Sequence, residues 1–215
     1  MMKIKISEVF YSLQGEGIQI GIPTVFVRLF GCDLRCSWCD SMYAVEGTDF
    51  SVLEINQVID NVLSYQCPNV CITGGEPLLQ LEQTLFLTEK FIEIDKKVIL
   101  ETAGHRKPPE IFKNPETIVS MDCKCPSSGM NSKSDLQNLI QLKSKDQIKF
   151  VIADDNDYVF AKNIVNQNSF NAEIIFQPAY GLKISEIANA VIKDKLRVRV
   201  LPQLHKDIWG DIKGV

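Results

Sequence analysis

Short, almost unbroken apolar runs recur along the chain, with helix-like stretches between several of them. The runs are rich in β-branched residues, and a nearly continuous apolar run is typical of a strand buried on both faces of a parallel sheet. The predicted strands are TVFVRLF (24–30), NVCIT (69–73), KVILET (97–102), ETIVSMD (116–122), QIKFVIA (147–153), AEIIFQ (172–177) and LRVRVLP (196–202). The first residues, KIKISEVFYS (3–12), predict a further strand or an edge segment.

Helix signals occupy four of the stretches between these runs. Ser51-Val-Leu-Glu54 has the form of a capping box and predicts a helix over 51–64. Apolar residues at helical spacing predict three further helices, two of which span 81–94 and 184–192. The third is capped by Asp154 or Asp155 and contains Tyr158, Val159, Ala161, Ile164 and Val165.

Repeated strand–helix–strand units predict an α/β fold with a parallel sheet and right-handed crossovers. Such a sheet is either doubly wound or curled into a partial, open barrel. We find no internal repeat, low-complexity segment or linker in the 215 residues. One domain over 1–215 is therefore expected, and a chain of this length can bury an ample core.

Composition narrows the function classes. A net charge of −4 and a pI near 5.3 argue against non-specific nucleic-acid binding, which needs an excess of Lys and Arg. There is no apolar run long enough to span a membrane, and the first residues lack the layout of a signal peptide. The expected location is the cytoplasm, where seven cysteines indicate metal binding or redox chemistry more than disulfides.

Three of those cysteines share one short loop, GCDLRCSWCDS (31–41), directly after an expected strand. Cys32, Cys36 and Cys39 can surround one face of a cluster without distant segments converging. Iron–sulfur clusters usually have four thiolate ligands, so three leave one iron open to a further ligand. The alternatives are a structural zinc site, which usually recruits a fourth Cys or His, and a redox Cys-x2-Cys pair, which leaves Cys32 unexplained.

A second motif, VCITGGEPLLQ (70–80), places Gly74 and Gly75 at the end of another strand. Glycines there let a ligand approach the main chain closely. Polar residues also follow later strands, where the sites of parallel α/β folds lie. They are Thr102, Gly104, Lys124 and Gln177. Taken singly, each of these residues is explained by a role in a turn or in a helix cap.

CxxxCxxC after the first barrel strand, an aromatic residue before the last cysteine and a following GGEP together resemble the radical S-adenosylmethionine superfamily. The resemblance implies the open, partial parallel β/α barrel of that superfamily. It also implies a 4Fe–4S cluster on Cys32, Cys36 and Cys39 whose open iron binds the methionine end of S-adenosylmethionine. In that superfamily the reduced cluster cleaves the cofactor to a 5′-deoxyadenosyl radical. It also implies contacts to the cofactor from Trp38, Cys39, Asp40, Gly74, Gly75, Glu76, Gly104, Lys124 and Gln177.

The segments YSLQGEG, RLFGCDLRCSWCD, TGGEP, ETAG, KCPSSGM, FQP and QLHK occur in an order that resembles the 7-carboxy-7-deazaguanine synthases of the queuosine and deazapurine pathway. That family converts 6-carboxy-5,6,7,8-tetrahydropterin into 7-carboxy-7-deazaguanine and ammonia, with Mg²⁺ assisting and hydrogen removed from C6 of the pterin. A homodimer and an electron donor such as flavodoxin are family expectations.

The same resemblance implies a set of substrate residues: Leu13, Gln14, Gly15, Glu16, Arg28, Thr102 and His205. Arg28 suits the substrate carboxylate because its planar guanidinium can pair with two oxygens, and an unpaired charge in an apolar strand would be costly. Ser41 stands where the family usually has a Thr ligand to Mg²⁺, and it keeps the hydroxyl oxygen that this ion accepts.

Two other functions remain open at this point. A glycyl-radical-type activating enzyme would share the cluster and GGEP but would act on a protein partner. A zinc-binding interaction module would bind metal without catalysis. Cys67, Cys71, Cys123 and Cys125 form no clean ligand quartet for a second metal site.

Overall fold

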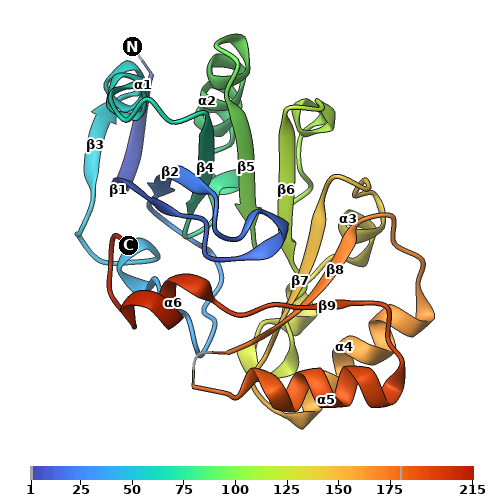
Figure 1. The fold of residues 1–215 in the computed structure, drawn as a ribbon. Coiled ribbons are helices and arrows are strands. Elements are labelled where there is room, and N and C mark those ends of the chain that lie inside the picture. The colour runs from blue at the N-terminus through green and yellow to red at the C-terminus, as the bar shows by residue number, and fades with distance from the viewer. Residues whose placement is uncertain (1, 180) are drawn as a thin grey trace.

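A single nine-stranded sheet organises the chain, of which the computed structural model describes residues 2–179 and 181–215 (Figure 1). The spatial order is β3-β1-β2-β4-β5-β6-β7-β8-β9, and all pairs from β2 to β9 are parallel. The strands are β1 (Lys3–Leu13), β2 (Pro23–Leu29), β3 (Ser51–Glu54), β4 (Asn69–Gly74), β5 (Lys97–Thr102), β6 (Thr117–Asp122), β7 (Gln147–Ile152), β8 (Glu173–Pro178) and β9 (Arg199–Val200).

The N-terminal strand β1 departs from the parallel pattern. It pairs antiparallel with both β2 and β3 and is therefore interior, with β3 at the edge. Only residues 14–22 connect β1 to β2. A parallel pairing would need a crossover of a dozen or more residues, so this short connection favours a hairpin.

The helices lie outside the curved sheet, apart from α6, which Figure 1 shows beside the loops at its open end. They are α1 (Ile55–Ser64), α2 (Leu81–Glu93), α3 (Leu136–Ile140), α4 (Asp155–Gln167), α5 (Ile184–Asp194) and α6 (Leu204–Trp209). Asp154 caps α4 as predicted, because its carboxylate accepts from the backbone N–H of Asp157 at 2.9 Å. No helix in the described part of the chain is long and apolar enough to cross a membrane.

Two sequence predictions about elements are wrong. Residues 51–54 form strand β3 rather than the first turn of a helix, and α1 starts only at Ile55. The capping box lies three residues later than predicted. Glu54 is the N-cap residue, and the Gln57 side chain accepts from its backbone N–H at 2.9 Å. The strand expected over 196–202 is reduced to Arg199–Val200, which pairs with β8 at two positions.

Side chains that alternate along each strand give the sheet an outer face and an inner face with different surroundings. On the outer face of β2, Val25 and Val27 join a core cluster that also contains Val58 and Val62 of α1. On the inner face, Phe26 packs with Cys71 and Ile99 in a separate small cluster. Since side chains in a strand alternate between faces, residues with the parity of Phe26 face the interior of the curved sheet. That interior holds the site.

Candidate active site

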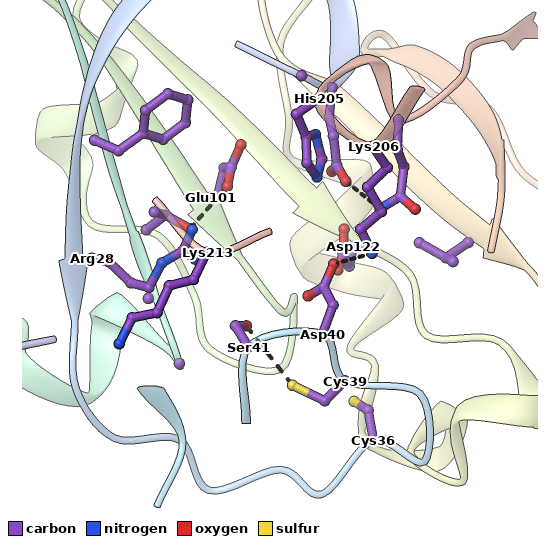
Figure 2. Close-up of a pocket in the computed structure, with 18 of the residues that line it drawn as sticks. Arg28, Cys36, Cys39, Asp40, Ser41, Glu101, Asp122, His205, Lys206 and Lys213 are labelled. Atoms are coloured by element: carbon purple, nitrogen blue, oxygen red, sulfur yellow. Dashed lines mark hydrogen bonds and ion pairs between the residues drawn. The ribbon is translucent and has the colours of Figure 1, made fainter. Parts of the chain in front are cut away.

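The inner face of the sheet opens into a cavity of about 500 Å³ at the C-terminal ends of the parallel strands. Inner-face residues of five successive strands line it, which are Arg28, Thr73, Glu101, Asp122 and Lys149. Pairing in register places Arg28 beside Thr73 and Asp122 beside Lys149, and Glu101 pairs with Ser120, two residues before Asp122. Figure 2 shows several of them converging. A largely apolar fold thus concentrates charge in one place.

The cysteine loop closes one side of this cavity. Cys32, Cys36 and Cys39 all line it, all are partly buried and none is in a disulfide. Burial raises the pKa of the Cys32 and Cys36 thiols. In the described residues no three Cys, His, Asp or Glu side chains are gathered as ligands of one metal ion. Three thiols on one wall fit a four-iron cluster with one iron left open to a further ligand.

Polar contacts hold the cysteine loop against the rest of the fold. Asp33 accepts from Arg106 at 2.7 Å and lies 2.8 Å from the His105 ring, which ties the loop to the segment after β5. On the other side, the Trp38 indole N–H donates to the Ser127 hydroxyl at 2.9 Å. The loop is therefore positioned from two directions.

The TGGEP segment packs its backbone against the start of the same loop. A Cβ atom at Gly75 would lie 2.3 Å from the Gly31 carbonyl oxygen, so no larger residue fits without a shift of the backbone. The backbone N–H of Glu76 donates to that same oxygen at 2.8 Å. Close approach of β4 to the cysteine loop is thus one structural reason for the paired glycines.

Glu76 itself is buried beneath the cavity. Its carboxylate accepts from the backbone N–H groups of Leu78 and Ala103 and from the Thr102 hydroxyl. Burial raises the pKa of Glu76, although these hydrogen bonds act in the opposite direction. In this structure the side chain joins the ends of β4 and β5.

Opposite the cysteines, the β1–β2 connection packs against the start of α6. The backbone N–H of Leu204 donates to the Gly15 carbonyl at 2.9 Å. A Cβ at Gly15 would lie 2.0 Å from the His205 ring, so the glycine admits His205 to the cavity. Gln14 is buried and donates to Glu101 at 3.2 Å, and the Thr73 hydroxyl donates to the same carboxylate at 2.8 Å.

Glu16 is held by three donors from three parts of the chain. Its Oε1 accepts from Gln177 at 2.9 Å and from Gln203 at 2.8 Å, and its Oε2 accepts from the Lys149 ammonium. Burial by itself raises the pKa of Glu16, but the charge of Lys149, that of His205 and the hydrogen bond from Gln203 bring the pKa well below its usual value. Glu16 is therefore a fixed, ionised carboxylate.

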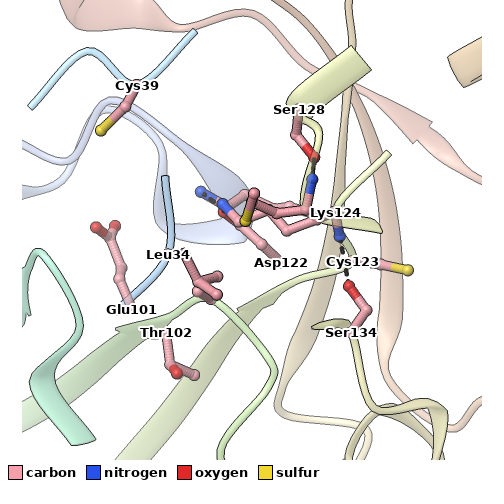
Figure 3. Close-up of polar contacts among 12 residues, drawn as sticks. Leu34, Cys39, Glu101, Thr102, Asp122, Cys123, Lys124, Ser128 and Ser134 are labelled. Atoms are coloured by element: carbon pink, nitrogen blue, oxygen red, sulfur yellow. Dashed lines mark hydrogen bonds and ion pairs between the residues drawn. The ribbon is translucent and has the colours of Figure 1, made fainter. Parts of the chain in front are cut away.

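The next charged pair lies at the end of β6, where Asp122 is the last residue of the strand and Lys124 follows it. The Lys124 ammonium is 2.6 Å from Asp122 Oδ2 and stands 5.6 Å from the centre of the Trp38 ring, and Figure 3 shows Lys124 and Asp122 together. Burial lowers the pKa of Lys124, but the negative charge of Asp122 outweighs it and keeps that pKa above its ordinary value. The backbone N–H of Lys124 donates to the Ser134 hydroxyl at 2.9 Å.

Arg28 lies between two aromatic rings at the β1–β2 side. Its Nε donates to Glu8 at 2.7 Å, and this hydrogen bond uses one of the five guanidinium N–H donors. The guanidinium charge stands over the Phe10 and Tyr43 rings. The Tyr43 hydroxyl donates to the same Glu8 oxygen at 2.7 Å. Glu8 therefore compensates the charge that the apolar strand carries.

The C-terminal segment covers the cavity. Asp40 forms a 2.8 Å ion pair with Lys206 of α6, and residues 210–215 all line the cavity. The Ser41 hydroxyl faces the same space and lies 3.8 Å from Cys39 Sγ (Figure 2).

Comparison with known proteins identifies relatives of this chain. The family model described as the radical SAM superfamily matches residues 27–118, from β2 into β6. Over 210 residues the chain is 36% identical to 7-carboxy-7-deazaguanine synthase from Thermoplasma acidophilum, covering 98% of this chain and 99% of that protein. It is 40% identical over 206 residues to the protein of the same name from Methanospirillum hungatei, covering 95% and 85%. The chain belongs to the 7-carboxy-7-deazaguanine synthase family.

The fold agrees with this membership. The crystal structure of QueE from Escherichia coli superposes with a TM-score of 0.76 at 22% identity, covering 95% of this chain and 96% of that one. The predicted open, partial parallel β/α barrel is thereby confirmed. The superfamily match implies the 4Fe–4S cluster and S-adenosylmethionine, and the full-length matches favour the synthase family over an activating enzyme or a zinc module.

Most residues that the sequence singled out meet in the cavity of this family member. The predicted residues that line it are Leu13, Gln14, Gly15, Glu16, Arg28, Cys32, Cys36, Trp38, Cys39, Asp40, Ser41, Gly74, Gly75, Thr102, Lys124 and His205. Three do not line it. Glu76 and Gln177 lie beneath the surface, and Gly104 allows β5 and β6 to approach, since its Cβ would meet the Asp122 carbonyl at 2.3 Å.

Tyr43, Thr73, Glu101 and Lys149 are among the polar cavity residues that sequence reasoning missed. A usable signal existed for Lys149, because a lysine inside the apolar strand QIKFVI raises the same question as Arg28 inside TVFVRLF. Thr73 and Glu101 face the cavity because each lies two residues after an inner-face residue of its own strand, Cys71 on β4 and Ile99 on β5.

The remaining cysteines lie away from the three-cysteine loop. Cys71 is fully buried on the inner face of β4, where Gln14 Nε2 lies 3.8 Å from its sulfur. Cys67 donates to the Pro23 carbonyl at 3.2 Å. Burial raises the pKa of Cys123 to about 12, and Cys125 is also buried. Each behaves as a small buried side chain.

Proposed function

We propose that this chain converts 6-carboxy-5,6,7,8-tetrahydropterin into 7-carboxy-7-deazaguanine and ammonia, using a 4Fe–4S cluster, S-adenosylmethionine and Mg²⁺. The observation that carries the proposal is the single cavity in which three cysteine thiols face a fixed carboxylate and a buried guanidinium. The full-length similarity to 7-carboxy-7-deazaguanine synthases supports it.

The cysteine wall forms the cofactor half. Cys32, Cys36 and Cys39 would hold the cluster, which supplies the electron that cleaves S-adenosylmethionine to the 5′-deoxyadenosyl radical. Gly74 and Gly75 line the cavity together with these thiols. The further cofactor contacts that we propose are Trp38, Asp40, Glu76, Gly104, Lys124 and Gln177. Of these, Gln177 is fully buried against Glu16, which favours an indirect role.

The opposite wall forms the substrate half. Glu16 presents an ionised acceptor that suits the N–H groups of an aminopyrimidine edge, and Leu13, Gln14, Gly15 and His205 complete that wall. Thr102 lines the same cavity from the end of β5. Arg28 would pair with the substrate carboxylate through donors other than the Nε that binds Glu8. The two halves share one cavity, so cofactor and substrate can lie side by side.

Magnesium would bind near Ser41. The hydroxyl of Ser41 lines the cavity between the cysteine loop and Arg28, and Mg²⁺ usually takes few protein oxygens and completes its octahedron with water and substrate oxygens. The absence of a carboxylate cluster in the described residues is compatible with such a site, because the substrate carboxylate can supply further oxygens. We also propose one domain over 1–215, an external electron donor such as flavodoxin, and a homodimer.

The proposal is tested by anaerobic turnover of the reconstituted enzyme with S-adenosylmethionine, Mg²⁺, a reductant and 6-carboxytetrahydropterin, followed by mass spectrometry. We expect 7-carboxy-7-deazaguanine to form, and to disappear with Cys36→Ala. Cys67→Ala is the matched control, because it removes a buried thiol outside the cavity. Formation of 5′-deoxyadenosine without the deazaguanine would reject the substrate and leave the cofactor assignment standing.

A further inference from the structure

Lys149 lies between two carboxylates in the interior of the sheet. Its side chain is 7% exposed, its ammonium contacts Glu16 Oε2, and it lies 3.4 Å from Asp122 Oδ1. Asp122 in turn binds Lys124 through its other oxygen at 2.6 Å. The four side chains form a row of alternating charge, Glu16, Lys149, Asp122 and Lys124, which is neutral as a whole.

The two ends of this row face different halves of the cavity. Glu16 belongs to the β1–β2 connection, where we place the pterin, whereas Lys124 stands over the Trp38 ring in the cysteine loop. Glu16, Asp122, Lys124 and Lys149 all line the cavity. Among the described residues, Lys149 thus contacts a carboxylate of the substrate wall, Glu16, and also Asp122, the ion-pair partner of Lys124 on the cofactor wall.

Lys149 also limits what Glu16 can bind. An ionised carboxylate offers about four acceptor positions. Gln177 and Gln203 occupy both positions of Oε1, and Lys149 occupies one position of Oε2. One position is left for an N–H of the substrate, and its direction is set by the three donors already in place.

We propose that Lys149 is a positioning residue shared by the pterin site and the S-adenosylmethionine site. This inference rests on the proposed function and deepens it. Removal of the ammonium leaves Glu16 and Asp122 buried next to each other without the cation that separates them. Breaking a buried ion pair in this way costs far more than the pair contributes, because an uncompensated charge remains. Both walls then lose their geometry at once.

The charge state supports the geometry. Burial lowers the pKa of Lys149, but the charges of Asp122, Glu16 and Glu101 outweigh it and keep that pKa well above the ordinary lysine value. The side chain is therefore a fixed cation, which suits a positioning role and not proton transfer at neutral pH.

The test measures two affinities separately in the cluster-loaded enzyme. With the cluster kept oxidised no turnover occurs, and calorimetry gives the Kd of S-adenosylmethionine alone and that of 6-carboxytetrahydropterin alone. Lys149→Met keeps the apolar stem and removes the charge, and we expect it to weaken both ligands by about tenfold or more. Lys149→Arg, which keeps a cation between the carboxylates, should restore both to within a few-fold of wild type.

Two comparison variants separate positioning from general stability. Gln203→Leu removes one donor to Glu16, so it should weaken the pterin and leave S-adenosylmethionine unchanged. Lys145→Met removes a lysine that binds Asp146 and the Phe112 and Thr117 carbonyls outside the cavity, so it should lower the melting temperature without changing either Kd. If Lys149→Met does not fold, Lys149→Gln keeps a neutral donor and should still weaken both ligands several-fold.

The outcomes distinguish the inference from the function on which it rests. If wild type binds both ligands and the Lys149 variants weaken only one or neither, the shared role is wrong. The same holds if Lys145→Met reproduces their effect. If wild type binds S-adenosylmethionine but not the pterin, the proposed substrate is wrong, and the pterin half of the inference is overturned with it.

Discussion

The Thr102 hydroxyl lies 2.9 Å from both carboxylate oxygens of Glu76, within the buried junction of β4 and β5. The contact closes a cradle that the N–H groups of Ala103 and Leu78 complete. It joins the GGEP motif to the strand end that the sequence marks as ETAG. The two motifs therefore depend on each other for their shape.

The first prediction concerns this contact. Thr102→Val keeps the side-chain shape and removes the donor, so it should lower the free energy of unfolding by about 1–3 kcal/mol, because a buried carboxylate loses a partner. Thr102→Ser keeps the hydroxyl and should recover most of the loss. Urea unfolding of the three proteins is the measurement, and equal stabilities would show that Glu76 does not need the hydroxyl.

The second prediction concerns acid stability. The pKa of Glu16 in the folded protein is below the ordinary value of 4.5. An acid whose pKa falls on folding stabilises the fold above its unfolded pKa and loses that contribution as the pH drops toward the folded value. Glu16→Gln should therefore be less stable than wild type at neutral pH, with the difference shrinking at about pH 3.5. A difference that stays constant with pH in urea unfolding would contradict the assigned pKa direction.

The third prediction concerns the substrate carboxylate. Arg28→Gln removes the cation from the inner face of β2, and we expect kcat/KM for the carboxypterin to fall by about tenfold or more, chiefly through KM. Arg199→Gln is the control, since Arg199 pairs with Glu173 on an exposed edge far along the sheet order. An unchanged KM in Arg28→Gln would remove Arg28 from the substrate site.

The fourth prediction concerns magnesium. Ser41→Ala deletes the one cavity hydroxyl next to the last cysteine, so the stimulation of turnover by Mg²⁺ should be lost or shifted to higher concentration. Ser41→Thr keeps the oxygen and should respond to Mg²⁺ as wild type does. Iron content should be unchanged in both variants, and a normal Mg²⁺ response in Ser41→Ala would contradict the proposed ligand.

The strands of the parallel sheet could be predicted because their apolar runs carry the signal locally. The predicted strand at 97–102 matches β5, and the predicted cap at Asp154 is present. The helix start at Ser51 failed for a physical reason. Residues 51–54 pair with β1, from Lys3 opposite Glu54 to Ile6 opposite Ser51, and such long-range pairing leaves no trace in the capping pattern.

Some residues of the candidate site could be predicted from the sequence and others could not. Family motifs identified residues outside the strands, such as Glu16 and His205, whose presence in the cavity the structure shows. Lys149 and Glu101 were missed because polar residues inside strands were read as parts of strands, although both line the cavity on the inner face. The partner of Gln177 could not be predicted, since Glu16 lies 161 residues away in sequence.

The most direct test of the central claim uses 6-carboxytetrahydropterin carrying deuterium at C6. The reconstituted enzyme is incubated anaerobically with this substrate, S-adenosylmethionine, Mg²⁺ and a reductant, and 5′-deoxyadenosine is analysed by mass spectrometry. The account predicts that deuterium appears in 5′-deoxyadenosine alongside 7-carboxy-7-deazaguanine, and that Cys32→Ala yields neither product. Deuterium-free 5′-deoxyadenosine with no deazaguanine would contradict the claim that this cavity performs radical chemistry on the pterin.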